Sequence, residues 1–236
     1  LSGVLKLGTG EEINIESTTY FTSLMPIPKT PTIDGKIELG EYNTNAPVKI
    51  DKEYMVEQII DWGGVSDASA TAYINYDKDY FYLAAVATDN VLGDNDEQKR
   101  IWANDSIQFA FVNENVSGSK ITEIGIGLVN GEPSIARYSF LGTKENIMFL
   151  EAEEKEGFNK DMELQITRSG NKTYYELKLP WEDIYATADD FNRKHVYFSI
   201  ILNDNDGSGR RGWLEFCPGI GGAKNAMLFS KVAVGK

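Results

Sequence analysis

The stretch ATAYINYDKDYFYLAAVAT, residues 70–88, decides the fold class of this chain. Its two parts, 70–76 and 79–88, are rich in β-branched and aromatic residues and show the alternation of a strand. The turn formers at 76–80 can reverse the chain between them. The stretch therefore predicts two antiparallel strands joined by a tight turn.

The same pattern recurs along the chain. Further strands are expected at 105–112, 122–129, 173–180 and 195–202. Turn-forming residues follow or separate them at 113–119, 129–133, 168–173 and 203–209. These elements predict an all-β fold, an antiparallel β-sandwich of the immunoglobulin-like or jelly-roll-like type. One short helix is expected at 180–186, because Pro180 suits a first helical turn.

The length and composition predict one folded module. A chain of 236 residues with 42% hydrophobic residues can bury a full core. Residues 1–28 are more polar and lead into a proline-bearing segment, so they are expected to form an N-terminal linker or an extra strand. Residues 29–236 are expected to form the module. Since the N-terminus lacks a basic and apolar leader, we expect a piece of a longer precursor.

Charge and residue usage exclude several classes of function. The 23 Lys and Arg residues against 36 Asp and Glu give a net charge of -13, which disfavours binding to nucleic acid and to anionic membranes. No apolar run is long enough for membrane insertion. Cys217 and His195 are the only residues of their types, which excludes intramolecular disulfides and most zinc sites. Any metal should therefore be held by oxygen.

The tryptophans are the clearest candidates for ligand binding, because the C–H faces of a sugar ring stack on aromatic rings. Trp181 follows a strand and is expected in the core, while Trp62 is expected in a glycine-flanked loop, either in the core or at the rim. Trp102 follows the polar run GDNDEQKRI, and Trp213 follows the loop NDNDGSGRRG. Both are therefore expected at strand ends beside long loops, where they can hold a sugar.

At this point the chain resembles carbohydrate-binding module family 9, whose members are appended to bacterial xylanases and related secreted enzymes. The matching stretches occur in the family's order from about residue 30 to the C-terminus. They are PTIDGKIELGEY, DYFYLAAVATDNVL, WANDSIQFAF, YYELKLPWEDI, FSIILNDNDGSGRRGWLEF and AMLFSKVAV.

The resemblance implies a β-sandwich in which Trp102 and Trp213 clamp a terminal sugar of a polysaccharide or oligosaccharide chain, such as xylan or cellulose. Gln108 stands where family members commonly have an acid, and its amide can donate to and accept from hydroxyls. The other candidate ligand-binding residues are Asn104, Arg100 and Arg211. The chain is then a non-catalytic, extracellular module next to other modules of a glycoside hydrolase or polysaccharide lyase.

The resemblance also implies structural calcium. Asp204 and Asp206, with a glycine following, have a spacing that can fold around a hard cation, although the full EF-hand pattern is absent. Asp89 begins a second acidic loop and is the third candidate ligand.

Positively charged residues precede both candidate sugar-binding tryptophans, which leaves the charge of the ligand open. Lys99 and Arg100 precede Trp102, and Arg210 and Arg211 precede Trp213. An arginine there could reach the carboxylate of a uronic acid, since its fork matches a carboxylate.

Three other functions remain alternatives. A calcium-dependent adhesion or assembly domain would use the same fold for protein contacts. An enzyme would need two carboxylates, for example Glu176 and Glu215, as acid and base. A haem protein would need His195 with a methionine as axial ligands, and no haem attachment motif supports that.

Overall fold

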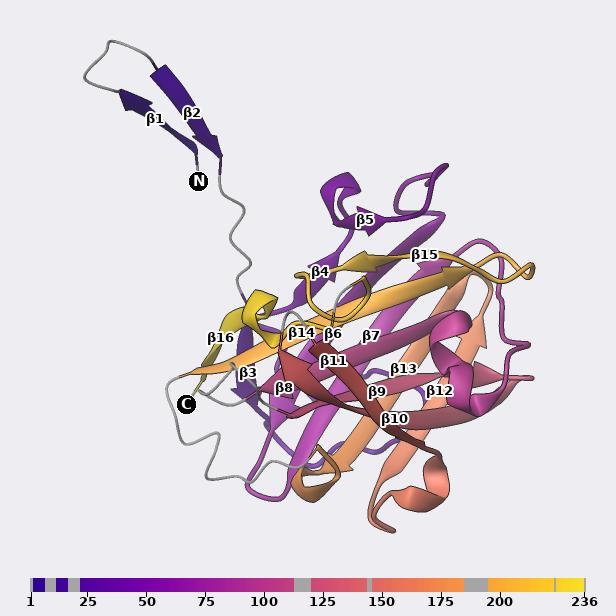
Figure 1. Ribbon diagram of the computed structural model, residues 1–236. Helices are drawn as coiled ribbons and strands as arrows, with labels where there is room; N and C mark the ends of the chain where they lie inside the picture. The colour runs from indigo at the N-terminus through magenta and orange to yellow at the C-terminus, as the bar shows by residue number, and fades with distance from the viewer. Residues whose placement is uncertain are drawn as a thin grey trace.

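The computed structural model describes residues 2–6, 12–16, 22–112, 120–143, 146–184, 195–222 and 224–235. Most of the strands form one curled sheet (Figure 1). From one edge to the other the order is β11 (Asn146–Glu153), β10 (Glu132–Thr143), β9 (Lys120–Val129), β8 (Ser106–Val112), β14 (His195–Asn205), β16 (Ser230–Val234), β3 (Ser23–Pro26), β6 (Ala68–Tyr76), β7 (Tyr80–Asp89), β13 (Lys172–Pro180) and β12 (Glu163–Ser169).

The remaining strands are short or separate. Within the same sheet, β15 (Arg210–Glu215) pairs with β14, β5 (Val56–Glu57) pairs with β15, and β4 (Val48–Ile50) pairs with β6. Two further strands, β1 (Ser2–Lys6) and β2 (Glu12–Glu16), form a hairpin of their own. All six strands expected from the alternation are present, and the all-β prediction is confirmed.

The hairpin of β6 and β7 supplies the first layer of the core. Alternate residues of β6, from Ala68 to Ile74, and of β7, from Phe81 to Ala87, are buried in one cluster. The ring of Phe81 lies 5.2 Å from that of Phe109 and 5.1 Å from that of Phe111, both on β8. The half of the sheet from β6 to β12 therefore faces the half from β11 to β16 across a common core. Trp181 is buried in this core, as expected.

Strand β3 joins the two halves and differs from the prediction. It lies between β16 and β6 and is parallel to both, whereas the sequence predicted an antiparallel arrangement. The halves are therefore parts of one sheet. Residues 23–26 come from the segment expected to be a linker or an extra strand, and they form a strand.

The helices of the described residues are all short 3-10 turns: η1 (Glu53–Met55), η2 (Gln98–Ala103), η3 (Lys155–Gly157), η4 (Trp181–Ile184) and η5 (Ala226–Leu228). The helix expected at 180–186 begins as η4, with Pro180 as the last residue of β13, and residues 185–194 lie outside the description. Nowhere in the described part of the chain is there a helix of the length and hydropathy needed to cross a membrane.

Candidate functional site

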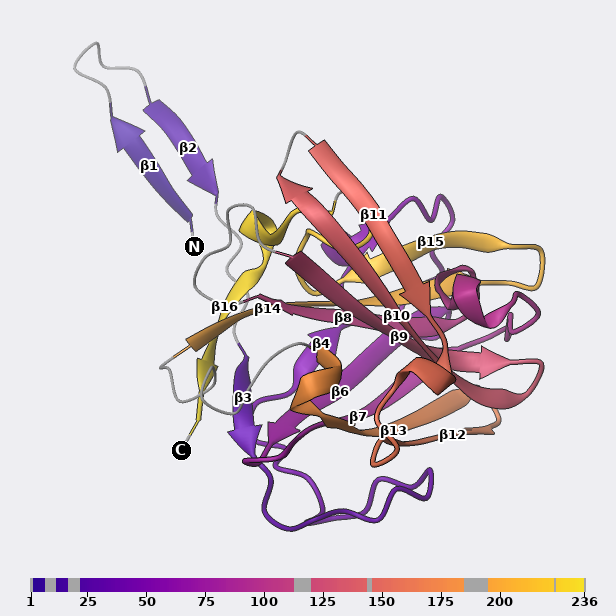
Figure 2. The same cartoon turned by 60° about the horizontal axis from the view of Figure 1, so that its bottom comes forward.

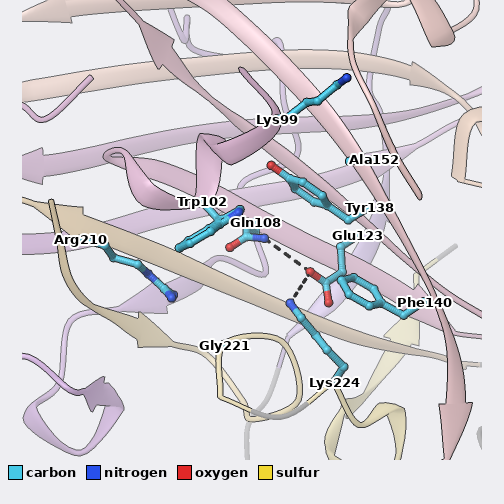
Figure 3. A pocket seen from close by; sticks show the side chains of 10 residues that line it. All are labelled: Lys99, Trp102, Gln108, Glu123, Tyr138, Phe140, Ala152, Arg210, Gly221 and Lys224. Atoms are coloured by element: carbon cyan, nitrogen blue, oxygen red, sulfur yellow. Dashed lines mark hydrogen bonds and ion pairs between the residues drawn. The ribbon is translucent and has the colours of Figure 1, made fainter. Parts of the chain in front are cut away.

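A cavity of about 370 Å³ lies against the strands β8 to β11, which run side by side in Figure 2. Three groups of residues line it, and Figure 3 shows their side chains. The strands supply Gln108, Glu123, Tyr138, Phe140 and Ala152; η2 supplies Lys99 and Trp102; β15 and the loop after it supply Arg210, Gly221 and Lys224.

Strand alternation explains the polar floor of the cavity. On β8 the neighbours of Gln108, Ile107 and Phe109, are buried in the core, so Gln108 lies on the opposite face. On β9 the same rule places Glu123 opposite Ile124. The sheet thus presents a buried amide and a buried carboxylate to the cavity.

A glycine lets η2 approach the sheet and positions the aromatic wall. A Cβ on Gly125 would lie 2.6 Å from Cγ2 of Ile101, so a larger residue would push η2 away. Ile101 is fully buried, which anchors the next residue, Trp102, at the cavity with a partly exposed ring. Arg100 lies 5.4 Å from the centre of this ring and pairs with Asp96 at 3.2 Å.

Glu123 is the charged centre of the floor. Its side chain is fully buried, and its Oε2 accepts hydrogen bonds from Lys224 Nζ at 2.7 Å and from Gln108 Nε2 at 3.4 Å. Its Oε1 has no hydrogen-bond partner among the described residues. Burial raises the pKa of Glu123, and the ammonium group of Lys224 opposes that rise. Glu123 can therefore accept a further hydrogen bond from a bound molecule.

Arg210 lies between the two tryptophans named by the sequence. Its Cζ is 4.5 Å from the ring centre of Trp213 and 5.7 Å from that of Trp102. Its Nη2 donates to Asn203 Oδ1 at 2.6 Å, and Asn203 in turn donates to Gln108 Oε1 at 3.0 Å. Burial lowers the pKa of Arg210 to about 10, so the guanidinium stays charged at neutral pH.

Trp213 is buried beneath this arginine. Its side chain is 3% exposed and its Nε1 donates to Glu215 Oε2 at 3.0 Å. A Cβ on Gly221 would clash with the indole ring, so the loop packs directly against Trp213. Trp213 therefore supports Arg210 from below. It is not among the described residues that line the cavity.

The other predicted ligand-binding residues separate into two groups. Gln108 lines the cavity with Trp102. Asn104 is fully buried and donates to the carbonyls of Asp96 and Leu128, which holds the loop around η2. Arg100 lies on Trp102 outside the lining, and Arg211 turns toward an acidic cluster.

Sequence reasoning missed Glu123 in the floor of the cavity and Lys224 at its side. Glu123 had a signal, because a charged residue interrupts the apolar strand TEIGIGLV. Lys224 had none, since its contact with Glu123 joins residues that are 101 positions apart in the sequence, a separation that no local pattern can bridge.

The three predicted metal ligands lie together. One carboxylate oxygen from each of Asp89, Asp204 and Asp206 falls within 4.8 Å of the others. Asp204 is fully buried, and in the part of the chain that the structure describes neither of its oxygens has a hydrogen-bond partner. Arg211 Nη1 lies 2.6 Å from Asp206 Oδ2 and 3.3 Å from Asp204 Oδ2. Orphaned, buried carboxylate oxygens in a group of three suit a hard cation.

Burial also makes this acidic cluster sensitive to protonation. Burial raises the pKa of Asp89 to about 7 and that of Asp204 to about 6, with the neighbouring carboxylates adding to both rises. Asp105 lies beside them, and burial followed by the charge of Asp89 raises its pKa to about 9. Its oxygens accept from the backbone amides of Gly93 and Asn205, so Asp105 holds the loops of the cluster.

The carboxylates considered for catalysis have other partners. Glu176 accepts hydrogen bonds from the backbone amides of residues 34–36 and from the hydroxyl of Tyr42. Glu215 accepts from Trp213. Neither is among the lining residues of the cavity.

Comparison with known proteins identifies the family of this chain. The family model described as "Carbohydrate family 9 binding domain-like" matches residues 33–229. The chain belongs to carbohydrate-binding module family 9. The resemblance seen in the sequence is thereby confirmed, and the family is one of non-catalytic binding modules. A search of curated protein sequences found no match to this module.

Solved structures share the fold of this family 9 module. A family 9 module from Caldicellulosiruptor kristjanssonii in complex with glucose has a TM-score of 0.51 and 15% identity, covering 91% of this chain and 96% of that one. A family 9 module from the same organism in complex with cellotriose has a TM-score of 0.51 and 16% identity, covering 90% of this chain and 93% of that one. A putative carbohydrate-binding protein from Bacteroides uniformis ATCC 8492 has a TM-score of 0.51 and 11% identity, covering 80% of this chain and 85% of that one.

Proposed function

We propose that this family 9 module binds the end of a polysaccharide or oligosaccharide chain in the cavity beside Trp102. The observation that carries the proposal is the combination of a partly exposed tryptophan wall with a floor of buried hydrogen-bonding groups, Gln108 and Glu123. Sugar recognition needs both, because the ring presents C–H faces and its edge presents hydroxyls.

The sugar ring stacks on Trp102 in this proposal, and its hydroxyls donate to Glu123 Oε1 and bond to the amide of Gln108. A clamp by both tryptophans would require Arg210 to leave the face of Trp213, which it covers at 4.5 Å. The guanidinium carbon of Arg210 also lies only 5.7 Å from the ring centre of Trp102, which leaves no room for a sugar ring between them, so we place Arg210 at the edge of the stacked ring. The second tryptophan acts through Arg210 by supporting its position.

The biological role that we propose is targeting. A secreted glycoside hydrolase or polysaccharide lyase that carries this module beside its other modules would be held at its substrate. The glucose and cellotriose complexes of the relative from Caldicellulosiruptor kristjanssonii support cellulose, and the wider family resemblance supports xylan. An extracellular location follows from that role.

We also propose that calcium stabilises the module. Asp89, Asp204 and Asp206 would hold it through carboxylate oxygens, which are the ligands that calcium prefers. The ion would neutralise the three carboxylates, two of which, Asp204 and Asp206, now pair with Arg211. It would thereby fix the end of β7 against the end of β14.

Calorimetric titration with glucose, cellotriose and xylo-oligosaccharides tests the saccharide proposal. We expect Trp102→Ala to weaken binding by about tenfold, because an aromatic stack contributes about 0.5–1.5 kcal/mol beyond its buried area. Tyr54→Ala is the matched control, since this aromatic side chain is 63% exposed and lies outside the cavity lining. Normal binding by a folded Trp102→Ala protein, or no binding across a broad panel, would refute the proposal.

A further inference from the structure

The cavity carries positive charge in an acidic chain. Three cationic side chains, Lys99, Arg210 and Lys224, line it together with one carboxylate, Glu123. Lys224 pairs with Glu123 at 2.7 Å, so these two charges offset each other. Figure 3 shows Lys99 and Lys224 at opposite ends of the lining. Arg210 and Lys99 supply the excess charge, although the whole chain has a net charge of -13.

Among the described residues Arg210 forms no ion pair with a carboxylate at contact distance, and Glu123, the carboxylate that acts on its charge, already pairs with Lys224. The Nη2 of Arg210 donates to the neutral amide of Asn203, and its buried Nε has no hydrogen-bond partner among the residues described. By contrast, Arg100, Arg137 and Arg211 each pair with at least one carboxylate. A partly buried cation whose nearby carboxylate is shared with a second cation is costly, so its position at a cavity indicates a ligand that supplies negative charge.

We infer that the cavity selects a saccharide whose terminal ring carries a carboxylate, that is, a hexuronic acid, and that Arg210 determines this specificity. The inference rests on the proposed function and adds the class of sugar. The planar guanidinium presents several donors that match a carboxylate, whereas a neutral hydroxymethyl group offers no charge to it.

The remaining lining residues fit the same ring. Trp102 lies 5.7 Å from the guanidinium carbon, so a ring stacked on the indole brings its substituents within reach of Arg210. Glu123 Oε1 accepts a hydroxyl of the ring, and because Lys224 neutralises this carboxylate, it does not repel the acidic group of the sugar. Lys99 adds attraction for an anionic chain.

A matched pair of ligands tests the inference. Methyl β-D-glucuronoside and methyl β-D-glucoside differ only at C6, and both can be titrated by calorimetry at millimolar concentration. We expect the glucuronoside to bind about tenfold more tightly at low salt, since a hydrogen bond to a charged group is stronger than one to a neutral group. The preference should shrink at about 0.5 M NaCl because salt screens the charges.

Two variants assign the preference to one residue. Arg210→Gln should lower the affinity for the glucuronoside much more than that for the glucoside, and should thereby remove most of the preference. Arg100→Gln is the matched control, because it removes the same charge beside Trp102 but outside the cavity lining, and it should leave the preference intact.

The outcomes separate the inference from the function on which it rests. Equal or tighter binding of the glucoside overturns the inference and leaves sugar binding in place. A preference that survives in Arg210→Gln overturns the role of Arg210. Binding of neither ligand, nor of any neutral oligosaccharide, overturns the proposed function and the inference together.

Discussion

Calcium binding at Asp89, Asp204 and Asp206 should raise the thermal stability of the module, and Asp204→Asn should abolish that effect. The reason lies in the buried oxygens of Asp204, which have no hydrogen-bond partner among the described residues and carry charge at pH 8, above the pKa of about 6 that burial gives this group. A bound cation would replace repulsion among three carboxylates by attraction.

The size of the effect follows from ligand linkage. An ion present at one hundred times its dissociation constant stabilises the folded state by about 2.7 kcal/mol. For a domain of 150–250 residues, each kcal/mol raises Tm by about 2–4 °C. We therefore expect calcium to raise Tm by about 5–10 °C at pH 8 relative to a chelator.

In chelator, the same pKa values give a second expectation. The unfolded state loses the protons of Asp89 and Asp204 near pH 4, whereas the folded state keeps them until about pH 7 and pH 6. The folded state thus holds more protons in this window, so stability falls as the pH rises through it. Calcium takes the place of these protons, and its stabilising effect should grow with pH.

Differential scanning calorimetry measures each Tm, with magnesium as a selectivity control because it demands a tighter octahedral shell. Asp161→Asn, a neutralisation at an exposed turn, is the matched variant and should keep the full calcium response. Equal Tm values in calcium and in chelator at pH 8, or an unchanged response in Asp204→Asn, would show that the reasoning is wrong.

Other residues give independent expectations. Lys224→Met should lower the free energy of unfolding, measured in urea, by about 2 kcal/mol, because it leaves Glu123 buried without its cation. Adding Glu123→Gln should recover part of that loss. An unchanged free energy of unfolding in Lys224→Met would contradict this expectation. The thiol of Cys217 should resist alkylation at pH 8 until the protein unfolds, because it is buried and burial raises its pKa to about 11; rapid labelling of the native protein would count against it. Gly125→Ala should cost about 1–3 kcal/mol of stability by crowding Ile101 and should weaken cellotriose binding by displacing Trp102, so unchanged calorimetric affinity would argue against η2 as the positioning element.

The sequence predicts local elements better than the way in which they meet. The hairpin of β6 and β7 can be predicted because its alternation and its turn residues are all contained in one continuous segment, residues 68–89. The position of β3 cannot be predicted in this way, because a four-residue strand that ends in proline shows too little alternation. Its parallel pairing depends on strands far away in the sequence.

The same contrast holds at the cavity and at the acidic cluster. The sequence pointed to Trp102 and Gln108, which line the cavity, and to the three aspartates that lie together. It could not separate the neighbours Arg210 and Arg211, which diverge because successive residues of a strand face opposite sides. One turns to the tryptophans and the other to the aspartates.

The strands that join the two halves of the sheet bear on where this module begins and ends. The family match covers residues 33–229, whereas β3 ends at Pro26 and β16 begins at Ser230. A protein trimmed to the family match would therefore lose both strands and expose the edges of β14 and β6. Exposed strand edges pair readily with other chains, so such a fragment would tend to aggregate. The two strands that join the halves of the sheet, β3 and β16, thus lie just outside the part of the sequence by which the family is recognised.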